Sequence, residues 1–304
     1  FNIGHNKNKI DKLASGEKEW ILTSAWRNDV VNSDDYRAYV GGTSGLIYGY
    51  VNDGFYTVAD FEPFDSKSRS WKLKEGVVDS SPLSDTPRPG NAKFKKLTPV
   101  DPNSTNPYQL TEADRTVIGN TTPKFSGGFG LNATYKGFDM SMFFNFMYDF
   151  DVLNANKIML TTWADNKENN FLMNIASDKR WRNFDDMGNE IRYSPEVLAE
   201  FNKNATMWNP TSIGRPICMS YAVEDGSFLR LNSATLGYTL PSVWTKKVGL
   251  SKVRFYVSGN NLFTLTGYSG YDPEVNIATG LTPNIDYNRY PRSRTYTFGA
   301  QLTF

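Results

Sequence analysis

The chain has 304 residues, and 33 Lys and Arg residues against 32 Asp and Glu residues leave a formal net charge of +1. This balance implies no strongly basic or acidic partner, and we expect no nucleic acid binding. No run of about 18 apolar residues occurs, so the sequence excludes a helical membrane span. An aromatic content of 14%, with 24 Gly and 15 Pro residues, is typical of strands joined by many turns. A transmembrane β-barrel fits this composition, because its strands alternate apolar and polar residues.

The chain contains one cysteine, Cys218, and one histidine, His5. Internal disulfides, zinc sites and histidine-based catalytic triads therefore lack the residues that they need. We expect no enzyme activity, no catalytic residue, no cofactor and no metal site. Cys218 is expected to be a small buried side chain, and His5 a solvated side chain near a strand end.

The first clear strand pattern lies between Ser126 and Phe150. Two alternating runs are separated by Lys136-Gly137, which predicts a tight turn and hence a β-hairpin. The glycines of the segment 127–130 are expected to relieve crowding inside a strand, because nothing after them resembles a phosphate-binding loop. One face of this hairpin is strongly apolar and consists of Phe129, Leu131, Ala133, Tyr135, Phe138, Met140, Met142, Phe144, Phe146 and Tyr148.

Residues 229–240 also alternate, but the leucines at the start of the segment lie on the opposite face from Leu236 and Tyr238. This change of phase predicts a β-bulge near residues 232–234. In residues 253–257 and 295–304, apolar and polar residues alternate without a break, which predicts two further strands.

Two short helices are expected between the strands. The first covers residues 194–201, where Ser194 could cap the helix, and the second follows Pro241 within residues 242–250.

These strands fit either a soluble β-sandwich or an outer-membrane barrel. Strands of about 10 residues with aromatic residues near their ends match the span and the girdles of a barrel. The connections alternate between very short, as at Lys136-Gly137, and very long, as from 153 to 226, which a compact sandwich rarely carries. The pattern favours a barrel whose long loops, at 56–124, 155–226 and 265–292, lie outside the cell.

A further observation concerns six segments that are spread over nearly the whole chain. They are NKNKI at 6–10, GLIYGYVNDGF at 45–55, DRTVIGNTTPKFSGGFG at 114–130, FLRLNSATLGYTLP at 228–241, VSGNNLFTLTGYSGYDPE at 257–274 and YPRSRTYTFGAQLTF at 290–304. In this order they resemble the C-terminal part of SusC/RagA-type TonB-dependent outer-membrane transporters, the nutrient importers of Bacteroidota. Two loop positions depart from the family pattern: Asn91 follows Pro89-Gly90 where Asp is usual, and Lys96 also stands where Asp is usual.

The resemblance implies an all-β fold, an antiparallel transmembrane β-barrel of about 22 strands in the outer membrane of a Gram-negative cell. Residues 1–304 would be the C-terminal section of that barrel, with about seven strands. The N-terminal plug domain and the TonB box would be absent from this chain. A sheet of that size could not close around a plug, so the chain is expected to be one piece of a larger protein.

The resemblance also implies partners and an activity. The partners are a SusD-like surface lipoprotein that acts as a lid, TonB through the missing N-terminal part, the remaining barrel and plug, and lipid or lipopolysaccharide. The implied activity is import of oligosaccharides or oligopeptides. A binding or adhesion barrel without active transport is the alternative, and an outer-membrane enzyme is a weaker third possibility.

The candidate cargo-binding residues are three tryptophans of the longest loop, Trp163, Trp181 and Trp208, whose indole faces could stack on sugars or apolar side chains. The alternative is that they pack the loop against itself or against the lid. The period-2 pattern predicts a lipid-facing set that consists of Phe138, Met140, Phe144, Phe146, Phe298, Leu302 and Phe304. It predicts a lumen-facing set that consists of Asn132, Thr134, Ser141, Asn145, Thr297 and Gln301.

Two groups of acidic residues have simpler explanations than a site. Asp185, Asp186 and Glu190 could imitate a glycosidase pair, but solvated loop acids are the commoner case. Asp272-Pro273-Glu274 offers too few oxygens for calcium, so a turn fixed by proline is expected there.

Overall fold

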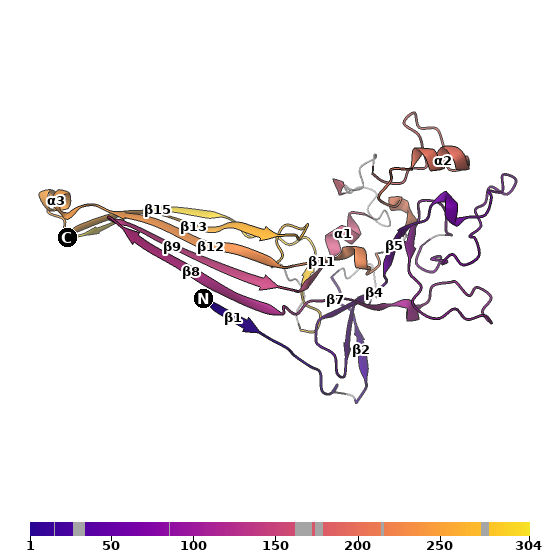
Figure 1. The fold of residues 1–304 in the computed structure, drawn as a ribbon, viewed down its shortest axis with the longest axis horizontal. Coiled ribbons are helices and arrows are strands. Elements are labelled where there is room, and N and C mark those ends of the chain that lie inside the picture. Colours follow the sequence, from indigo (N-terminus) through magenta and orange to yellow (C-terminus); the bar gives the residue numbers. More distant parts are fainter. Residues whose placement is uncertain are drawn as a thin grey trace.

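The structure is a computed structural model that describes residues 1–14, 16–26, 34–84, 86–161, 172–173, 179–213, 216–274 and 280–304. The molecule is elongated, with a long β-sheet at one end and a compact loop region at the other (Figure 1). Within the described residues, no helix is long and apolar enough to cross a bilayer.

Six antiparallel strands form the long sheet in the order β1-β8-β9-β12-β13-β15. The described part of the chain thus supplies six strands to this sheet, against the expectation of about seven. Five of the strands are 9 to 15 residues long, which is enough to cross a membrane at a tilt. The bounds are β1 Asn2–His5, β8 Phe125–Tyr135, β9 Phe138–Tyr148, β12 Phe228–Thr239, β13 Lys252–Thr266 and β15 Thr295–Thr303.

The predicted hairpin is confirmed. β8 and β9 pair along their full lengths, and Tyr135 lies opposite Phe138 at the closed end. Lys136 and Gly137 form the turn with φ values of 46° and 91°. Two successive positive φ values are what a type I′ turn requires, and its twist matches that of the strands that it joins.

The register separates apolar and polar side chains onto opposite faces of the sheet. Phe144 of β9 lies opposite Phe129 of β8 and Leu231 of β12, whereas Ser141 lies opposite Asn132 on the other face. The apolar face carries Phe138, Met140, Phe144, Phe146, Phe298 and Leu302, and Phe304 follows just after the last strand. The polar face carries Asn132, Thr134, Ser141, Asn145, Thr297 and Gln301. Contact of the apolar face with lipid stays a prediction.

The predicted bulge in β12 is confirmed. β12 pairs with β9 at Leu231↔Phe144 and again at Ser233↔Phe143, so two steps along β12 correspond to one step along β9. Asn232 is the extra residue. It restores the phase of the strand, because the leucines of β12 then all lie on the apolar face.

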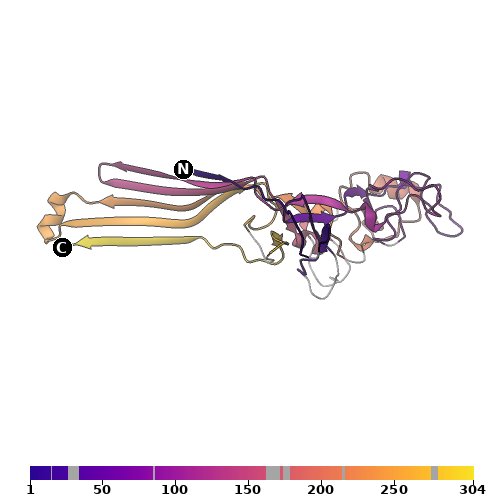
Figure 2. The same cartoon turned by 90° about the horizontal axis from the view of Figure 1, so that it is seen from below.

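Short and long connections leave opposite ends of the sheet (Figures 1 and 2). The turn after β8, the segment with α3 (Ser242–Thr245) and the C-terminus lie at one end. From the other end leave loop 1 (residues 6–124), loop 2 (149–227) and loop 3 (267–294). This confirms the predicted asymmetry. Loop 1 begins earlier than the predicted residue 56, because residues 36–55 pair with other loop strands instead of the long sheet.

The loop region consists of short elements. Loop 1 contains β2 Glu19–Leu22, β3 Tyr36–Tyr39, β4 Leu46–Gly49, β5 Asn52–Phe55, β6 Ala92–Phe94 and β7 Thr116–Asn120. Loop 2 contains β10 Asp151–Asn154, α1 Ala155–Met159, α2 Pro195–Phe201 and β11 Val223–Asp225, and loop 3 contains β14 Ile285–Asp286. These strands form the sheets β2-β3-β4-β7, β5-β6 and β11-β10-β14, and the parallel pair β10 and β14 joins loop 2 to loop 3.

Both expected helices are present. α2 begins after Ser194 as predicted, although the Ser194 side chain makes no capping hydrogen bond. α3 begins after Pro241. The sequence did not predict α1, whose cap is Asn154: the side chain of Asn154 accepts a hydrogen bond from the backbone N–H of Lys157 at 3.0 Å.

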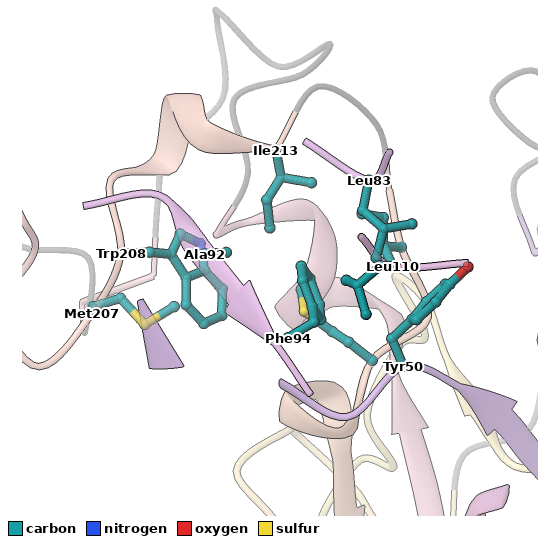
Figure 3. Close-up of a cluster of buried hydrophobic side chains, with 10 residues drawn as sticks. Tyr50, Leu83, Ala92, Phe94, Leu110, Met207, Trp208 and Ile213 are labelled. Carbon is teal, nitrogen blue, oxygen red and sulfur yellow. The ribbon is translucent and has the colours of Figure 1, made fainter. Parts of the chain in front are cut away.

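Loops 1 and 2 bury their apolar residues against each other. Figure 3 shows one such cluster, in which Tyr50, Phe94 and Leu110 of loop 1 meet Trp208 and Ile213 of loop 2. A second cluster joins all three loops and contains Tyr36, Ile47, Leu153, Ala155, Ile158, Cys218, Ala222 and Ile285. The loop region is therefore one folded body instead of three separate flexible loops.

Candidate functional site

A cavity of about 570 Å³ lies in the loop region between loops 1 and 2. Loop 1 contributes segments around Trp71 and Pro89, and loop 2 contributes segments around Trp181, Tyr193 and Pro210. A volume of this size is typical of a site for a small molecule or part of an oligomer.

Gly90 lies against Trp181, which is one of the residues that line this cavity. The backbone N–H of Trp181 donates to Met207 O at 2.8 Å, and Asn209 N–H donates to Gly90 O at 2.8 Å. Gly90 has a φ of +89°, and a Cβ at this position would overlap the indole ring of Trp181. The Pro89-Gly90-Asn91 segment thus lets the two loops approach closely.

Five arginines line the cavity: Arg69, Arg88, Arg180, Arg182 and Arg192. Arg182 pairs with Asp186 at 2.8 Å, and Arg192 pairs with Glu190. Within the described residues, the other three arginines make no ion pair with a carboxylate.

Asp185 is the one acidic residue among the described residues of the lining. The Asp185 carboxylate accepts hydrogen bonds from the side chain and the backbone N–H of Asn189, at 2.9 and 2.8 Å. The side-chain hydrogen bond from Asn189 is the largest cause that lowers the pKa of Asp185. The carboxylate is thus held within its own turn, and the three arginines without an ion pair in the described residues leave the lining with an excess of positive charge.

Aromatic rings hold some of these arginines in place. The Arg69 guanidinium lies 5.1 Å from the centre of the Tyr193 ring, and the Arg192 guanidinium lies 5.7 Å from the centre of the Phe184 ring. Phe184 is 47% exposed, so part of its side chain is accessible to a ligand. Arginine and aromatic faces together can bind planar or charged groups.

Trp181 and Trp208, two of the candidate cargo-binding residues, are buried. Their side chains are 3% and 2% exposed, and each packs in an apolar cluster. Trp208 Nε1 donates to Thr161 O at 3.3 Å, and its ring meets Tyr221 edge to face. Trp163 lies outside the described residues. Burial favours packing for Trp181 and Trp208, and a cargo-binding role for the three tryptophans stays a prediction.

The acidic residues in both of the sets singled out in the sequence form hydrogen bonds or ion pairs within the protein. Asp185 closes its turn, while Asp186 and Glu190 pair with arginines. Asp272 accepts a hydrogen bond from the Arg230 side chain at 2.6 Å, and Glu274 lies 3.3 Å from Arg230 Nε. The second group thus attaches loop 3 to β12 through a buried ion pair.

The polar face of the long sheet carries one charged contact across three strands. Arg254 of β13 donates through Nε to Asp139 of β9 at 2.9 Å, and its guanidinium passes over Gly237 of β12. A side chain at Gly237 would occupy the space of the guanidinium. Glycine at this position therefore allows the ion pair to form on the face predicted to be the lumen.

Three further residues singled out by the sequence have structural roles. His5 is exposed, and its Nδ1 lies 2.6 Å from Lys124 O. Burial raises the pKa of the Cys218 thiol, which is 7% exposed, so this side chain is a packed thiol as predicted. Lys96 donates to Gln109 O at 3.0 Å and lies 3.4 Å from the buried carboxylate of Asp114.

No family model matches the chain. TonB-dependent receptor P3 of Formosa agariphila is 32% identical over 310 residues, which covers 100% of this chain and 26% of the receptor. TonB-dependent receptor P39 of the same organism is 24% identical over 100% of this chain and 28% of that receptor. SusC of Bacteroides thetaiotaomicron is 38% identical over 28% of this chain and 8% of SusC. The chain spans about a quarter of the length of the two Formosa receptors.

The RagAB peptide importer in its open-open state has a similar structure, with a TM-score of 0.60 and 21% sequence identity. The match covers 99% of this chain and 26% of that chain. The RagAB importer in its closed-closed state gives a TM-score of 0.59.

The fold is therefore a section of an antiparallel transmembrane β-barrel with long extracellular loops. The relatives named as TonB-dependent receptors and SusC place this barrel in the outer membrane of a Gram-negative cell. The resemblance to SusC/RagA-type TonB-dependent transporters is confirmed, and the length that the chain covers is consistent with the C-terminal part of their barrel.

The arginine-lined cavity could not be predicted from the sequence. Its arginines lie between positions 69 and 192, and only the folding of loop 1 against loop 2 brings them together. One local signal was present in the sequence, the run Lys179-Arg180-Trp181-Arg182. Alternating basic and aromatic residues of this kind indicate a surface for charged or planar ligands.

Proposed function

We propose that this chain is part of an outer-membrane nutrient importer. Its long sheet would form a section of the barrel wall, with the apolar face toward lipid and the polar face toward the lumen. The observation that carries the proposal is that loops 1, 2 and 3 leave the same end of the sheet and fold into one body with a cavity. Such a body is suited to capture cargo at the extracellular entrance of a barrel.

The proposed partners follow from the relatives. A SusD-like surface lipoprotein would cover the loop region as a lid, and TonB would supply energy through the rest of the protein, which includes the plug and the remaining barrel. Exposed aromatic residues of loop 3 suit such an interface, since Tyr271 and Tyr290 are 83% and 90% exposed. The proposed cargo is an oligosaccharide or an oligopeptide, and RagAB is a peptide importer with this fold.

The test is uptake by cells that produce or lack the full-length protein. Cells without the gene should lose growth on the cargo oligomer as sole nutrient and should regain it on complementation. Accumulation of labelled cargo should also stop when TonB is removed. An adhesion barrel predicts a different result, in which cells bind the cargo at the surface but accumulate none, whether or not TonB is present.

A further inference from the structure

We propose that the cavity between loops 1 and 2 binds the carboxylate groups of an anionic cargo oligomer. This inference rests on the proposed import function and specifies the chemistry of the cargo. Its basis is the set of three arginines, Arg69, Arg88 and Arg180, that line the cavity without a carboxylate partner in the described part of the chain.

The charge distribution favours an anionic ligand. The whole chain has a net charge of only +1, yet five arginines and one aspartate line this cavity, and only two of these arginines pair with a carboxylate in the described part of the chain. Cations gathered in a concave site repel one another and focus a positive potential into it, and a bound anion relieves that repulsion. Arginine also presents a planar fork of donors that matches the two oxygens of a carboxylate in two parallel hydrogen bonds.

The backbone at Arg69 gives independent support. Arg69 has a φ of 53°, a conformation that is uncommon for residues other than glycine. The tight turn from Asp65 to Ser70 holds it there, with hydrogen bonds at 3.3 Å in both directions between these two backbones. The turn places the guanidinium against the Tyr193 ring at the cavity wall. Unfavourable backbone conformations of this kind concentrate at ligand-binding positions.

Calorimetry on the purified full-length protein tests the proposal. The probes are a short oligogalacturonide, an oligoglutamate of matched length and a neutral malto-oligosaccharide. We expect at least one anionic probe to bind, with an affinity that falls as the salt concentration rises, and the neutral probe to bind more weakly. The triple variant Arg69→Gln, Arg88→Gln, Arg180→Gln should bind that probe roughly 100-fold more weakly.

Two further variants separate local contacts from net charge and from misfolding. The control Lys12→Gln, Lys18→Gln, Lys72→Gln removes the same charge at exposed loop residues outside the cavity, and its affinity should change by less than about threefold. The triple Arg→Lys variant keeps the charge but loses the paired hydrogen bonds, so its affinity should lie between those of wild type and the Gln variant.

Each outcome has a definite meaning. Binding of the oligogalacturonide alone assigns the anionic groups to a sugar, and binding of the oligoglutamate alone assigns them to a peptide. The proposal is overturned if neither anionic probe binds, if the neutral probe binds as well as they do, or if the Gln variant binds like the control. It is also overturned if the Gln variant loses only its association with a SusD-like lipoprotein. Since binding to purified protein needs no TonB, this test can fail while import in cells persists, and the reverse.

Discussion

Gly90 packs against Trp181, a residue of the cavity lining, and leaves no room for a side chain. Its positive φ and its contact with the Trp181 ring both exclude a side chain. Gly90→Ala should therefore destabilise the loop region by roughly 1–3 kcal/mol more than a strained backbone alone would, because Trp181 must move. Hydrogen exchange measured by mass spectrometry should then be faster than in wild type in peptides that cover residues 86–94.

The matched control is Gly76→Ala. Gly76 has a similar φ of +84°, but nothing lies within 4 Å of a Cβ built there. The strain of an alanine at positive φ is common to both variants, so their difference isolates the contact with Trp181. Equal exchange in the two variants would mean that Trp181 does not constrain this position.

Asp35 makes the stability of the loop region depend on pH. Its side chain is fully buried beside Tyr36, and burial raises the pKa of Asp35 to about 6, although Ser24 donates two hydrogen bonds to the carboxylate. Because the folded-state pKa exceeds the ordinary value of 3.8, the folded state binds the proton more tightly than the unfolded state. The resulting stabilisation is complete below about pH 4 and is lost as the pH rises through about 6.

Asp35→Asn should remove this pH dependence. The loop strands β3 and β4 of the variant should be more stable than wild type above about pH 6, by up to roughly 3 kcal/mol, and should show no fall between pH 4 and 6. The measurement is hydrogen exchange of residues 34–49, corrected for the intrinsic effect of pH on exchange. Asp34→Asn serves as a control, since the Asp34 side chain is 48% exposed. If the stability of these strands still fell between pH 4 and 6 in Asp35→Asn, the pH dependence would belong to another titratable group.

The sequence predicted residue roles well where local chemistry decides them. Cys218 is buried, and Gly127 and Gly128 are crowded: a Cβ on Gly127 would overlap the Asn2 carbonyl. The expectation of crowding is wrong for Gly130, where a Cβ would make only an ordinary contact at 3.6 Å. The sequence could not decide between binding and packing for Trp181, because the ring is covered by Gly90 and Phe55 from a segment about 100 residues away. Burial of a loop aromatic is set by tertiary contacts that no local pattern records.

The bulge in β12 keeps both halves of that strand in phase with the sheet. Deletion of Asn232 should move either the residues before it or those after it to the wrong face, and bury leucines against polar neighbours. We expect the full-length protein to lose assembly, measured as the heat-modifiable folded form in the outer membrane. Deletion of Asn103, in the exposed turn 101–106, should leave assembly intact. Normal assembly without Asn232 would show that β12 can slip in register without penalty.

The two faces of β9 should differ in their tolerance of charge. Phe144 lies on the apolar face, stacked on Phe129 at 4.7 Å between ring centres, and Ser141 lies on the polar face. Phe144→Arg should destabilise the assembled barrel by roughly 2–4 kcal/mol, because the charge would enter lipid, and Ser141→Arg should cost much less. Urea unfolding of the protein in lipid vesicles measures the difference. An equal loss of stability in the two variants would mean that both faces of β9 contact water or protein.

Long strands were predictable from sequence, and short loop strands were not. The period-2 pattern of β8, β9 and β15 extends over at least 9 residues. An alternation of this length is unlike what the amino-acid composition alone would produce, so it indicates a strand. β14 has only two residues and pairs in parallel with β10, more than 100 residues earlier in the chain. No local alternation can specify a strand of this length, since its pairing depends on how loop 2 and loop 3 pack.

At the scale of the whole molecule, the loop region depends on cores that no single loop completes. Loop 1 supplies Tyr50, Phe94 and Leu110 to the cluster in Figure 3, and loop 2 supplies Trp208 and Ile213. Removal of either side would expose the other to water, and each large apolar side chain left uncovered costs about 1.5–3 kcal/mol. The loops should therefore fold and unfold together, even though their strands attach to the barrel separately.

Excision of most of loop 2 tests this dependence. Leu153 of β10 pairs with Val223 of β11, so a short Gly-Ser linker can join residue 155 to residue 222 without disturbing that pair. The barrel should still assemble, because none of the long strands is altered, and the full-length variant should keep its heat-modifiable form. Residues 50–110 should become sensitive to protease at the cell surface, because the apolar residues of loop 1 lose their partners. If loop 1 of the variant resisted protease as well as in wild type, loop 1 would fold without loop 2. Its side of the cavity would then be folded even when the side from loop 2 is absent.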